Sequence, residues 1–325
     1  MLKSNEMHYN AESQWLVVNG LIAKDLYRHP LKPRPKRGEF NAARFDDLAG
    51  NTTLGCHLGE MTGEKNIGHR HVDEAIIFML GGPGYSILYN NDTTRNWPTQ
   101  HKVPWQSGSL LAIPVNAYHQ HFNLDPATPV RQLAIKNVPL LRKVFNSSEV
   151  IYANSFRFLD RYNDEADYYA RSEKVAERVL RTNIVPDLRT VELAPWPERG
   201  IGVSTLYFDM AGMQTLRPHV TELAPGGRTA PHRHLREELI HVLGGSGHTR
   251  IWVDGGPEVT IEWEAGDLFS PPLNAWHEHV NTGAGPARYY SVECIVVERL
   301  FLNDRFVTDT DFAFTDRLSR VLESA

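Results

Sequence analysis

One pattern of glycine, histidine and proline occurs twice in the 325-residue chain, and each occurrence consists of two separated halves. The later copy reads GGRTAPHRHLREELIHVLGG from Gly226 and GDLFSPPLNAWHEHVN from Gly266. The earlier copy reads GEKNIGHRHVDEAIIFMLGG from Gly63 and GSLLAIPVNAYHQHFN from Gly108. An internal repeat on this scale predicts two copies of one domain.

The histidines of each copy are spaced so that they can converge on one metal ion. His232 and His234 are two residues apart, so an extended strand places both on the same face. His277 is distant along the chain and can join them only if an antiparallel sheet folds back. Random placement of the histidines gives about 0.7 His-x-His pairs, whereas the sequence has four, at positions 69/71, 119/121, 232/234 and 277/279. We therefore expect metal ligands at His232, His234, Glu238 and His277, and at His69, His71 and His119.

These motifs resemble those of the cupin superfamily. The pattern G-x5-H-x-H-x3-E-x6-G is matched at every place in the later copy, and G-x5-P-x-G-x2-H-x3-N is matched except for Asn274. The earlier copy departs at Asn116 and at Ala75, which stands where the glutamate ligand belongs. Glu74 lies one residue early, on the wrong parity for a strand. The resemblance implies an all-β fold of two cupin barrels, each a double-stranded β-helix or jelly roll.

Short strand-like runs separated by turn residues support such barrels. In the connector, Asn163 as an N-cap and a shared face for Tyr168, Val175 and Val179 predict a helix. The run HPLKPRPKRG predicts an extended, solvated arm because proline cannot donate to a strand ladder. The expected divisions are an N-terminal arm (1–43), barrel 1 (44–138), a helical connector (139–190), barrel 2 (191–297) and a C-terminal helix or tail (298–325).

The composition narrows the class of partner. A hydrophobic content of 41% and a charged content of 22% are typical of a soluble globular protein. A net charge of −5 gives no general attraction to nucleic acid or to an anionic membrane, and no run is long enough to span one. Cys56 and Cys294 fit a reducing compartment. We expect a cytoplasmic protein with a small-molecule ligand. Because bicupins often associate, we also expect a homo-oligomer.

The ligand sets favour different chemistry at the two sites. Imidazoles with or without one carboxylate suit Fe(II), Mn(II), Ni(II) or Zn(II). In an octahedral ion, three histidines leave three positions, enough for a chelating substrate and O₂ together. Glu238 would occupy one of these positions. The earlier copy therefore suits oxygen chemistry, and the later copy suits a monodentate ligand or an auxiliary ion.

A narrower resemblance involves HRHVDEAIIF and AYHQHFN. These segments look like the first cupin of the gentisate and salicylate ring-cleaving dioxygenases. The resemblance implies a single Fe(II) on His69, His71 and His119 and an enzyme of aromatic compound catabolism. The complete ligand set of the later copy departs from that family, and this leaves open which barrel is catalytic. A metal-dependent lyase, decarboxylase or isomerase using Glu238 is one alternative, and a non-catalytic bicupin that binds a small acid or sugar is another.

Further groups are expected beside the metal ions. His121 and His279 share the parity of His119 and His277, and we interpret them as pocket groups rather than ligands. Arg131 and Arg288 follow the motif histidines at matching positions, which makes them symmetric candidates for a carboxylate clamp. A surface ion pair at a strand edge is the alternative for each arginine.

Overall fold

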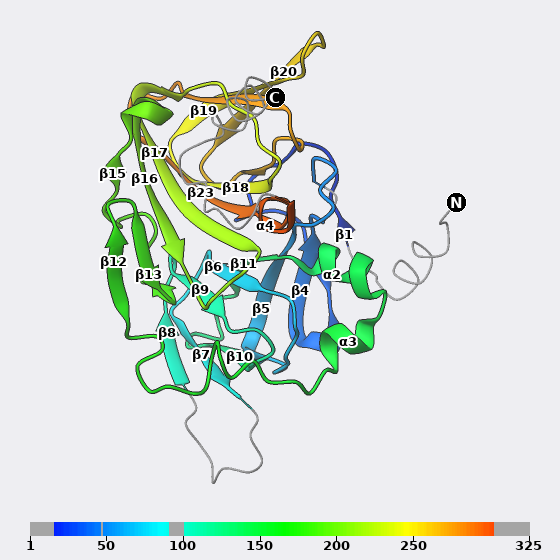
Figure 1. The fold of residues 1–325 in the computed structure, drawn as a ribbon. Helices are drawn as coiled ribbons and strands as arrows, with labels where there is room; N and C mark the ends of the chain where they lie inside the picture. The colour runs from blue at the N-terminus through cyan, green and yellow to red at the C-terminus, as the bar shows by residue number, and fades with distance from the viewer. Residues whose placement is uncertain (1–15, 47, 91–100, 302–325) are drawn as a thin grey trace.

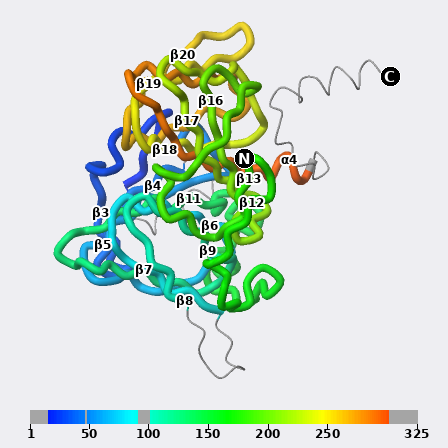
Figure 2. Tube along the Cα trace, turned by 90° about the vertical axis from the view of Figure 1, so that its left-hand side faces the viewer, coloured from blue at the N-terminus to red at the C-terminus, as the bar shows by residue number. Residues whose placement is uncertain are grey.

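The computed structural model describes residues 16–46, 48–90 and 101–301, and it consists mainly of β-strands in two curled sheets (Figure 1). One sheet has 11 strands and the other has 12, and the described helices are short. Figure 2 shows the two sheets as separate rings, one above the other. The predicted all-β fold of two barrels is confirmed.

The sheet that carries the earlier motif copy is called the first barrel. Its strands are β1 (Leu16–Val17), β3 (Lys32–Pro33), β4 (Gly38–Arg44), β5 (Gly55–Asn66), β6 (Ala75–Met79), β7 (Gly84–Tyr89), β8 (His101–Trp105), β9 (Leu110–Ile113), β10 (Tyr118–Asn123), β11 (Val130–Lys136) and β14 (Ile184–Val185). Burial alternates along β7, as expected of a strand with one wet face, whereas β6 is buried throughout. The apolar run AIIFM therefore faces the barrel interior on one side and a second core on the other.

The sheet that carries the later motif copy is called the second barrel. Its strands are β2 (Ile22–Ala23), β12 (Ser172–Ala176), β13 (Val179–Thr182), β15 (Ala194–Pro195), β16 (Gly200–Asp209), β17 (Leu216–Thr229), β18 (Glu237–Gly244), β19 (Ser246–Trp252), β20 (Glu258–Glu264), β21 (Leu268–Phe269), β22 (Trp276–Asn281) and β23 (Ala287–Cys294). The described helical segments are η1 (Pro35–Arg37), α2 (Val138–Phe145), α3 (Ser148–Tyr152), η2 (Pro197–Arg199) and α4 (Val296–Phe301).

Two short strands are exchanged between the barrels. β2 lies between β1 and β3 of the first barrel in sequence but pairs with β21 of the second, where Ile22 faces Phe269. β14 precedes the main strands of the second barrel but pairs with β9 of the first, where Ile184 faces Leu111. Each barrel thus gains a short strand from the part of the chain that leads into the other barrel.

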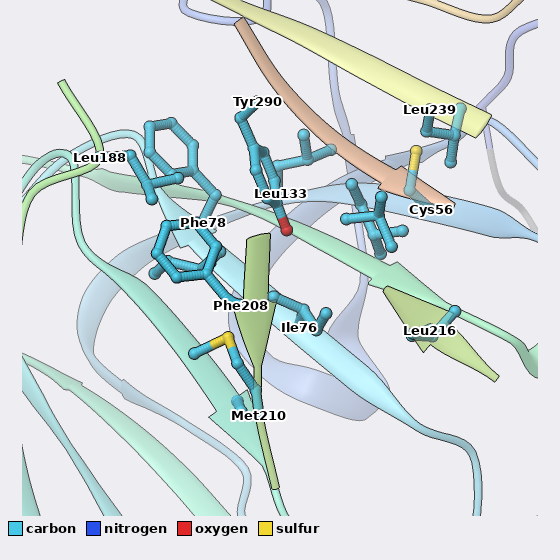
Figure 3. Close-up of a cluster of buried hydrophobic side chains, with 14 of the residues drawn as sticks. Cys56, Ile76, Phe78, Leu133, Leu188, Phe208, Met210, Leu216, Leu239 and Tyr290 are labelled. Carbon is cyan, nitrogen blue, oxygen red and sulfur yellow. The ribbon is translucent and has the colours of Figure 1, made fainter. Parts of the chain in front are cut away.

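A shared apolar core joins the two barrels (Figure 3). Ile76, Phe78 and Leu133 contribute from the first barrel, and Leu239 and Tyr290 contribute from the second. All five side chains are at most 1% exposed. Both cysteines, Cys56 and Cys294, are free and buried in the same core.

The helix predicted from Asn163 onward is wrong. The structure has turns there, followed by the β12–β13 hairpin, and β13 pairs in parallel with β16. Tertiary pairing with an available strand edge outweighs the weak helical periodicity of this segment. α2 and α3 supply helix only at the start of the connector. Of the predicted C-terminal helix, residues 302–325 lie outside the described part of the chain, and no helix in the described ranges is long and apolar enough to cross a membrane.

Candidate metal centres

The second barrel brings three histidines together at the meeting of β17, β18 and β22. His232 and His277 pair through their backbones, with N–O distances of 3.0 and 2.8 Å. One ring nitrogen from each of His232, His234 and His277 lies within 4.8 Å of the others, and all three residues are buried. Glu238 Oε2 lies 3.5 Å from His234 Nε2. The three predicted histidines therefore converge in space with Glu238 beside His234, while Glu238 also belongs to a second group of convergent atoms with His219 and Glu293.

Hydrogen bonds indicate which nitrogen of each imidazole carries the hydrogen. The Nδ1 atoms of His232, His234 and His277 lie 2.8, 2.9 and 2.9 Å from backbone carbonyl oxygens. A carbonyl can only accept, so each Nδ1 carries the hydrogen and each Nε2 presents a lone pair. The buried Nε2 atoms of His234 and His277 have no hydrogen-bond partner among the described residues. Orphaned, convergent imidazole nitrogens of this kind fit a metal ion.

Electrostatics favour the ligating forms in the second barrel. Burial lowers the pKa of His277 well below its ordinary value, and the charge of His234 adds to the effect. Burial alone would raise the pKa of Glu238, but the His234 side chain beside it outweighs burial and lowers that pKa. A neutral His277 next to an ionised Glu238 matches the protonation states that a divalent cation requires.

The first barrel repeats the arrangement without the carboxylate. His69 and His119 pair through their backbones at 3.0 and 2.8 Å, and with His71 they form a second group of convergent nitrogens. The Nδ1 atoms of His69, His71 and His119 again lie near backbone carbonyls, at 3.1, 3.1 and 3.0 Å. Burial lowers the pKa of all three well below the ordinary value. These residues also fit a metal ion.

A cavity of about 70 Å³ adjoins the histidines of the first barrel. Its lining is rich in cationic and hydrogen-bonding groups, namely Arg37, Arg44, His57, His121, Gln132, Lys136, Arg142 and Tyr152. Such a lining suits a small anionic ligand.

His121 lines the cavity of the first barrel and His279 is buried at the matching position of the second, and their Nδ1 partners differ from those of the proposed ligand histidines. His121 Nδ1 lies 2.7 Å from Ser86 Oγ, and His279 Nδ1 lies 2.8 Å from Thr249 Oγ1. Each hydroxyl oxygen already accepts an indole N–H, from Trp105 at 3.0 Å or from Trp263 at 2.9 Å. We assign the hydroxyl hydrogen to Nδ1, an assignment that places the hydrogen of each neutral ring on Nε2. Burial lowers the pKa of His121 to about 3 and that of His279 to about 4.

Comparison with known protein families identifies the domain. Residues 219–293 match the family model described as Cupin domain, and this range contains the complete ligand set of the second barrel. The first barrel repeats its motifs and its paired histidine backbones. The chain thus contains a cupin domain at residues 219–293 and has the two-barrel fold of a bicupin.

Solved structures support this fold over most of the chain. The bicupin aligns over 85% of its length with oxalate decarboxylases from Bacillus subtilis (TM-score 0.55, 14% identity, 76% of that chain) and from Lactobacillus farciminis (TM-score 0.56, 16% identity, 86% of that chain). It aligns over 77% of its length with a salicylate 1,2-dioxygenase from Pseudaminobacter salicylatoxidans (TM-score 0.55, 16% identity, 73% of that chain).

A relative found by sequence has a name similar to that of the salicylate 1,2-dioxygenase. The bicupin is 25% identical over 250 residues to a 5-aminosalicylate 1,2-dioxygenase from Comamonas sp.. The alignment covers 71% of the bicupin and 62% of the relative, so the bicupin spans less than two thirds of that protein's length.

Arg131 is not among the residues that line the cavity of the first barrel, and both Arg131 and Arg288 form ion pairs and backbone contacts elsewhere. Arg131 pairs with Glu60 at 2.7 Å and donates to the backbone carbonyls of Leu26 and His29. Arg288 pairs with Glu222 at 2.8 Å and donates to the carbonyls of residues 188, 189 and 191. These contacts match the alternative of an ion pair for each arginine, and both guanidinium groups hold the segments that carry the exchanged strands.

Sequence reasoning missed a different symmetric pair of arginines. Arg199 Nη2 lies 2.8 Å from His232 Nε2, and Arg37 lines the cavity of the first barrel. Both end a short 3-10 turn that is closed by a glycine with positive φ, Gly38 at 85° or Gly200 at 149°. The sequence indicates this pair through the repeated motif P-x-R-G at residues 35–38 and 197–200. The basic run expected to be a solvated arm therefore delivers Arg37 to the cavity.

Glu74 does not reach the metal centre of its own barrel. Its carboxylate accepts hydrogen bonds from the backbone N–H groups of Gln214, Thr215 and Leu216 in the second barrel, at 2.6, 2.9 and 3.1 Å. Glu237, at the same place in the later motif, accepts from the N–H groups of residues 52, 53 and 54 at 2.7, 2.7 and 2.9 Å. Glu74 therefore lies one residue before the ligand position because its carboxylate binds the other barrel instead of a metal ion.

Proposed function

We propose that this bicupin is a non-haem Fe(II)-dependent dioxygenase that cleaves the ring of a small hydroxylated aromatic acid at the first barrel. The observation that carries the proposal is the set of three neutral histidines, His69, His71 and His119, beside a cavity lined by cationic groups. Among the described residues, no carboxylate belongs to this ligand group. The names of the Comamonas relative and of the Pseudaminobacter structure support the substrate class.

The bound metal would supply Lewis acidity and a redox path between the aromatic acid and O₂. The chain itself binds and orients the substrate. Arg37 lines the cavity beside the three histidines, so its guanidinium is placed to take a substrate carboxylate in bidentate fashion.

His121 has a separate role in this proposal. It lines the cavity, its pKa is held low by burial and by the charges of Lys136 and Arg37, and its hydrogen lies on Nε2. It therefore presents a fixed N–H donor where negative charge develops on a substrate oxygen. Preorganised donors of this kind stabilise a transition state more than they stabilise the bound substrate.

A second candidate function rests on Glu238. A carboxylate at 3.5 Å from His234 Nε2 completes a ligand set that suits Mn(II), Ni(II) or Fe(II) at the second barrel. The structural likeness to oxalate decarboxylases is compatible with a metal-dependent lyase, decarboxylase or isomerase at that site. For the dioxygenase proposal, the second barrel holds an auxiliary ion.

The two candidates are separated by metal analysis and O₂ uptake on wild type, His119→Ala and His277→Ala. With Fe(II) and salicylate, gentisate or 5-aminosalicylate, we expect wild type to consume O₂, His119→Ala to lose this activity and its first-barrel metal, and His277→Ala to retain O₂ uptake. Loss of activity only in His277→Ala, or consumption of oxalate without O₂, would favour the second candidate. Metal-free protein that binds these acids as tightly as loaded protein would indicate a binding bicupin.

A further inference from the structure

The first barrel places a buried lysine against one of its metal ligands. Lys136 Nζ, at the end of β11, lies 2.9 Å from His71 Nε2 and 3.3 Å from Asp73 Oδ2. The Lys136 side chain is 9% exposed. His71 Nδ1 gives its hydrogen to the Asp73 carbonyl, so Nε2 can only accept and the ammonium donates to it. The lysine therefore occupies the lone pair that the metal would use.

Strand register shows what Lys136 replaces. Lys136 pairs across the ladder with Ala75, the position where the glutamate ligand is missing. At the same place in the second barrel, Glu238 pairs with Glu293. The two sites thus have opposite charge at matched positions, Ala and Lys in the first and Glu and Glu in the second.

The local partners preserve this contrast. Glu293 is neutralised by Arg217 at 2.7 Å and Arg236 at 3.0 Å, which leaves the Glu238 carboxylate facing the histidines. In the first barrel Asp73 is the acidic partner of Lys136, while Arg37 adds a further positive charge to the same cavity. A divalent ion in the first barrel must therefore displace an ammonium hydrogen bond and then remain beside that like charge.

We infer that the first barrel binds its metal ion tightly only together with an anionic chelating ligand, and that Lys136 is the residue that couples the two. An oxyanion of the ligand accepts the hydrogen bond that His71 gives up and offsets the charge of the ammonium. The second barrel, which has Glu238, holds its ion without a ligand. The inference rests on the proposed function only for the class of anion, an ortho-hydroxy aromatic carboxylate.

Coupling of this kind is reciprocal and can be measured without turnover. If the anion tightens the metal, the metal tightens the anion by the same factor. The test uses His277→Ala protein, so that second-barrel binding is weakened, with Co(II) followed by its absorption spectrum and by equilibrium dialysis. Salicylate is the anionic chelator, and salicylamide is its neutral counterpart.

With Lys136 present, we expect salicylate to tighten Co(II) binding by about tenfold or more and salicylamide to leave it nearly unchanged. Lys136→Met should tighten Co(II) without any anion and reduce the salicylate effect to near zero. Lys136→Arg retains the charge and should retain the coupling, and Lys136→Gln provides a second neutral variant if the Met variant does not fold. Lys102→Met, at an exposed position of the same barrel, is the matched control and should behave like its parent.

Weaker Co(II) binding in both Lys136→Met and Lys136→Gln would overturn the inference, because it would make the lysine a support for the metal. Equal Co(II) affinity with and without salicylate in the parent protein would also overturn it. The outcome is independent of the proposed function. Coupling between Co(II) and salicylate binding without O₂ uptake would contradict the dioxygenase proposal alone. O₂ uptake without that coupling would contradict the role of Lys136 alone.

Discussion

At the scale of single residues, the partner of Nδ1 separates the proposed ligand histidines from the histidines two residues after them. Where the partner is a backbone carbonyl, as at His119 and His277, the ring presents a lone pair suited to a metal. Where the partner is a hydroxyl that already accepts an indole N–H, as at His121 and His279, the ring presents a donor. One His-x-His spacing thus yields a ligand followed by a hydrogen-bond donor.

Ser86→Ala tests this division of roles. Removal of the hydroxyl frees His121 to move its hydrogen to Nδ1, so the donor toward the cavity is lost while the ligand histidines are untouched. We expect kcat with an ortho-hydroxy aromatic acid to fall by about 10- to 100-fold, the usual effect of losing such an orienting partner. Thr249→Ala makes the matched change in the second barrel, and steady-state kinetics should show little effect there. Equal loss in both variants would contradict the assignment.

Residues of the site differ in how far sequence could reveal them. The seven proposed ligands could be predicted because their spacing within the glycine and proline pattern is fixed by strand geometry. Arg37 lies in a segment remote from the motifs, and only comparison of its P-x-R-G with that of Arg199 would have exposed it. Lys136 belongs to no pattern at all, because its meaning comes from its cross-strand pairing with Ala75.

At the scale of elements, the strands that carry the histidines could be predicted and the β12–β13 hairpin could not. β12 is exposed along its whole length, so its sequence carries no alternation, and its conformation follows from pairing with β13. Tight approaches between elements are also specified locally. In both barrels a glycine lies beneath the tryptophan that supports the donor histidine, Gly84 under Trp105 and Gly247 under Trp263.

Gly84→Ala should disturb the β7–β8 pairing. A Cβ at this position would meet the Trp105 ring at 2.0 Å and the Phe122 carbonyl oxygen at 2.5 Å, so the indole must move away from Ser86. We expect a loss of about 1–3 kcal/mol in the free energy of unfolding, as for other overpacked sites, measured by urea denaturation. Gly285→Ala is the control, since a Cβ there meets nothing within 4 Å. Equal stability of the two variants would show that the contact is relieved at no cost.

At the scale of the whole molecule, the barrels are joined by the shared core and by two reciprocal carboxylates. Glu74 reaches from the first barrel into the second, and Glu237 reaches back. Each carboxylate satisfies three successive backbone N–H groups that would otherwise lack partners at the barrel boundary. The sequence showed the repeat that makes this symmetry possible, but it did not show that the two copies face each other.

Glu237→Gln tests the clamp. The amide places an NH₂ group against the N–H donors of residues 52–54, so at least one buried donor loses its partner. We expect a loss of about 1–3 kcal/mol in the free energy of unfolding, with a lower thermal midpoint in calorimetry and a single transition, because both barrels share one core. Glu262→Gln, at an exposed position of β20, serves as the control. An unchanged midpoint in Glu237→Gln would show that the carboxylate contributes nothing to the junction.

The exchanged strands β2 and β14 constrain how a nascent chain can assemble. β9 keeps an open edge until Ile184 and Val185 have left the ribosome, although the other main strands of the first barrel are synthesised well before that point. β2 is made near the start of translation yet waits for β21, which appears only at Leu268–Phe269. Fragments separated between residues 136 and 184 would each expose an unpaired edge prone to association. Because each barrel depends on a strand from the other half, we expect the two halves to fold as one unit.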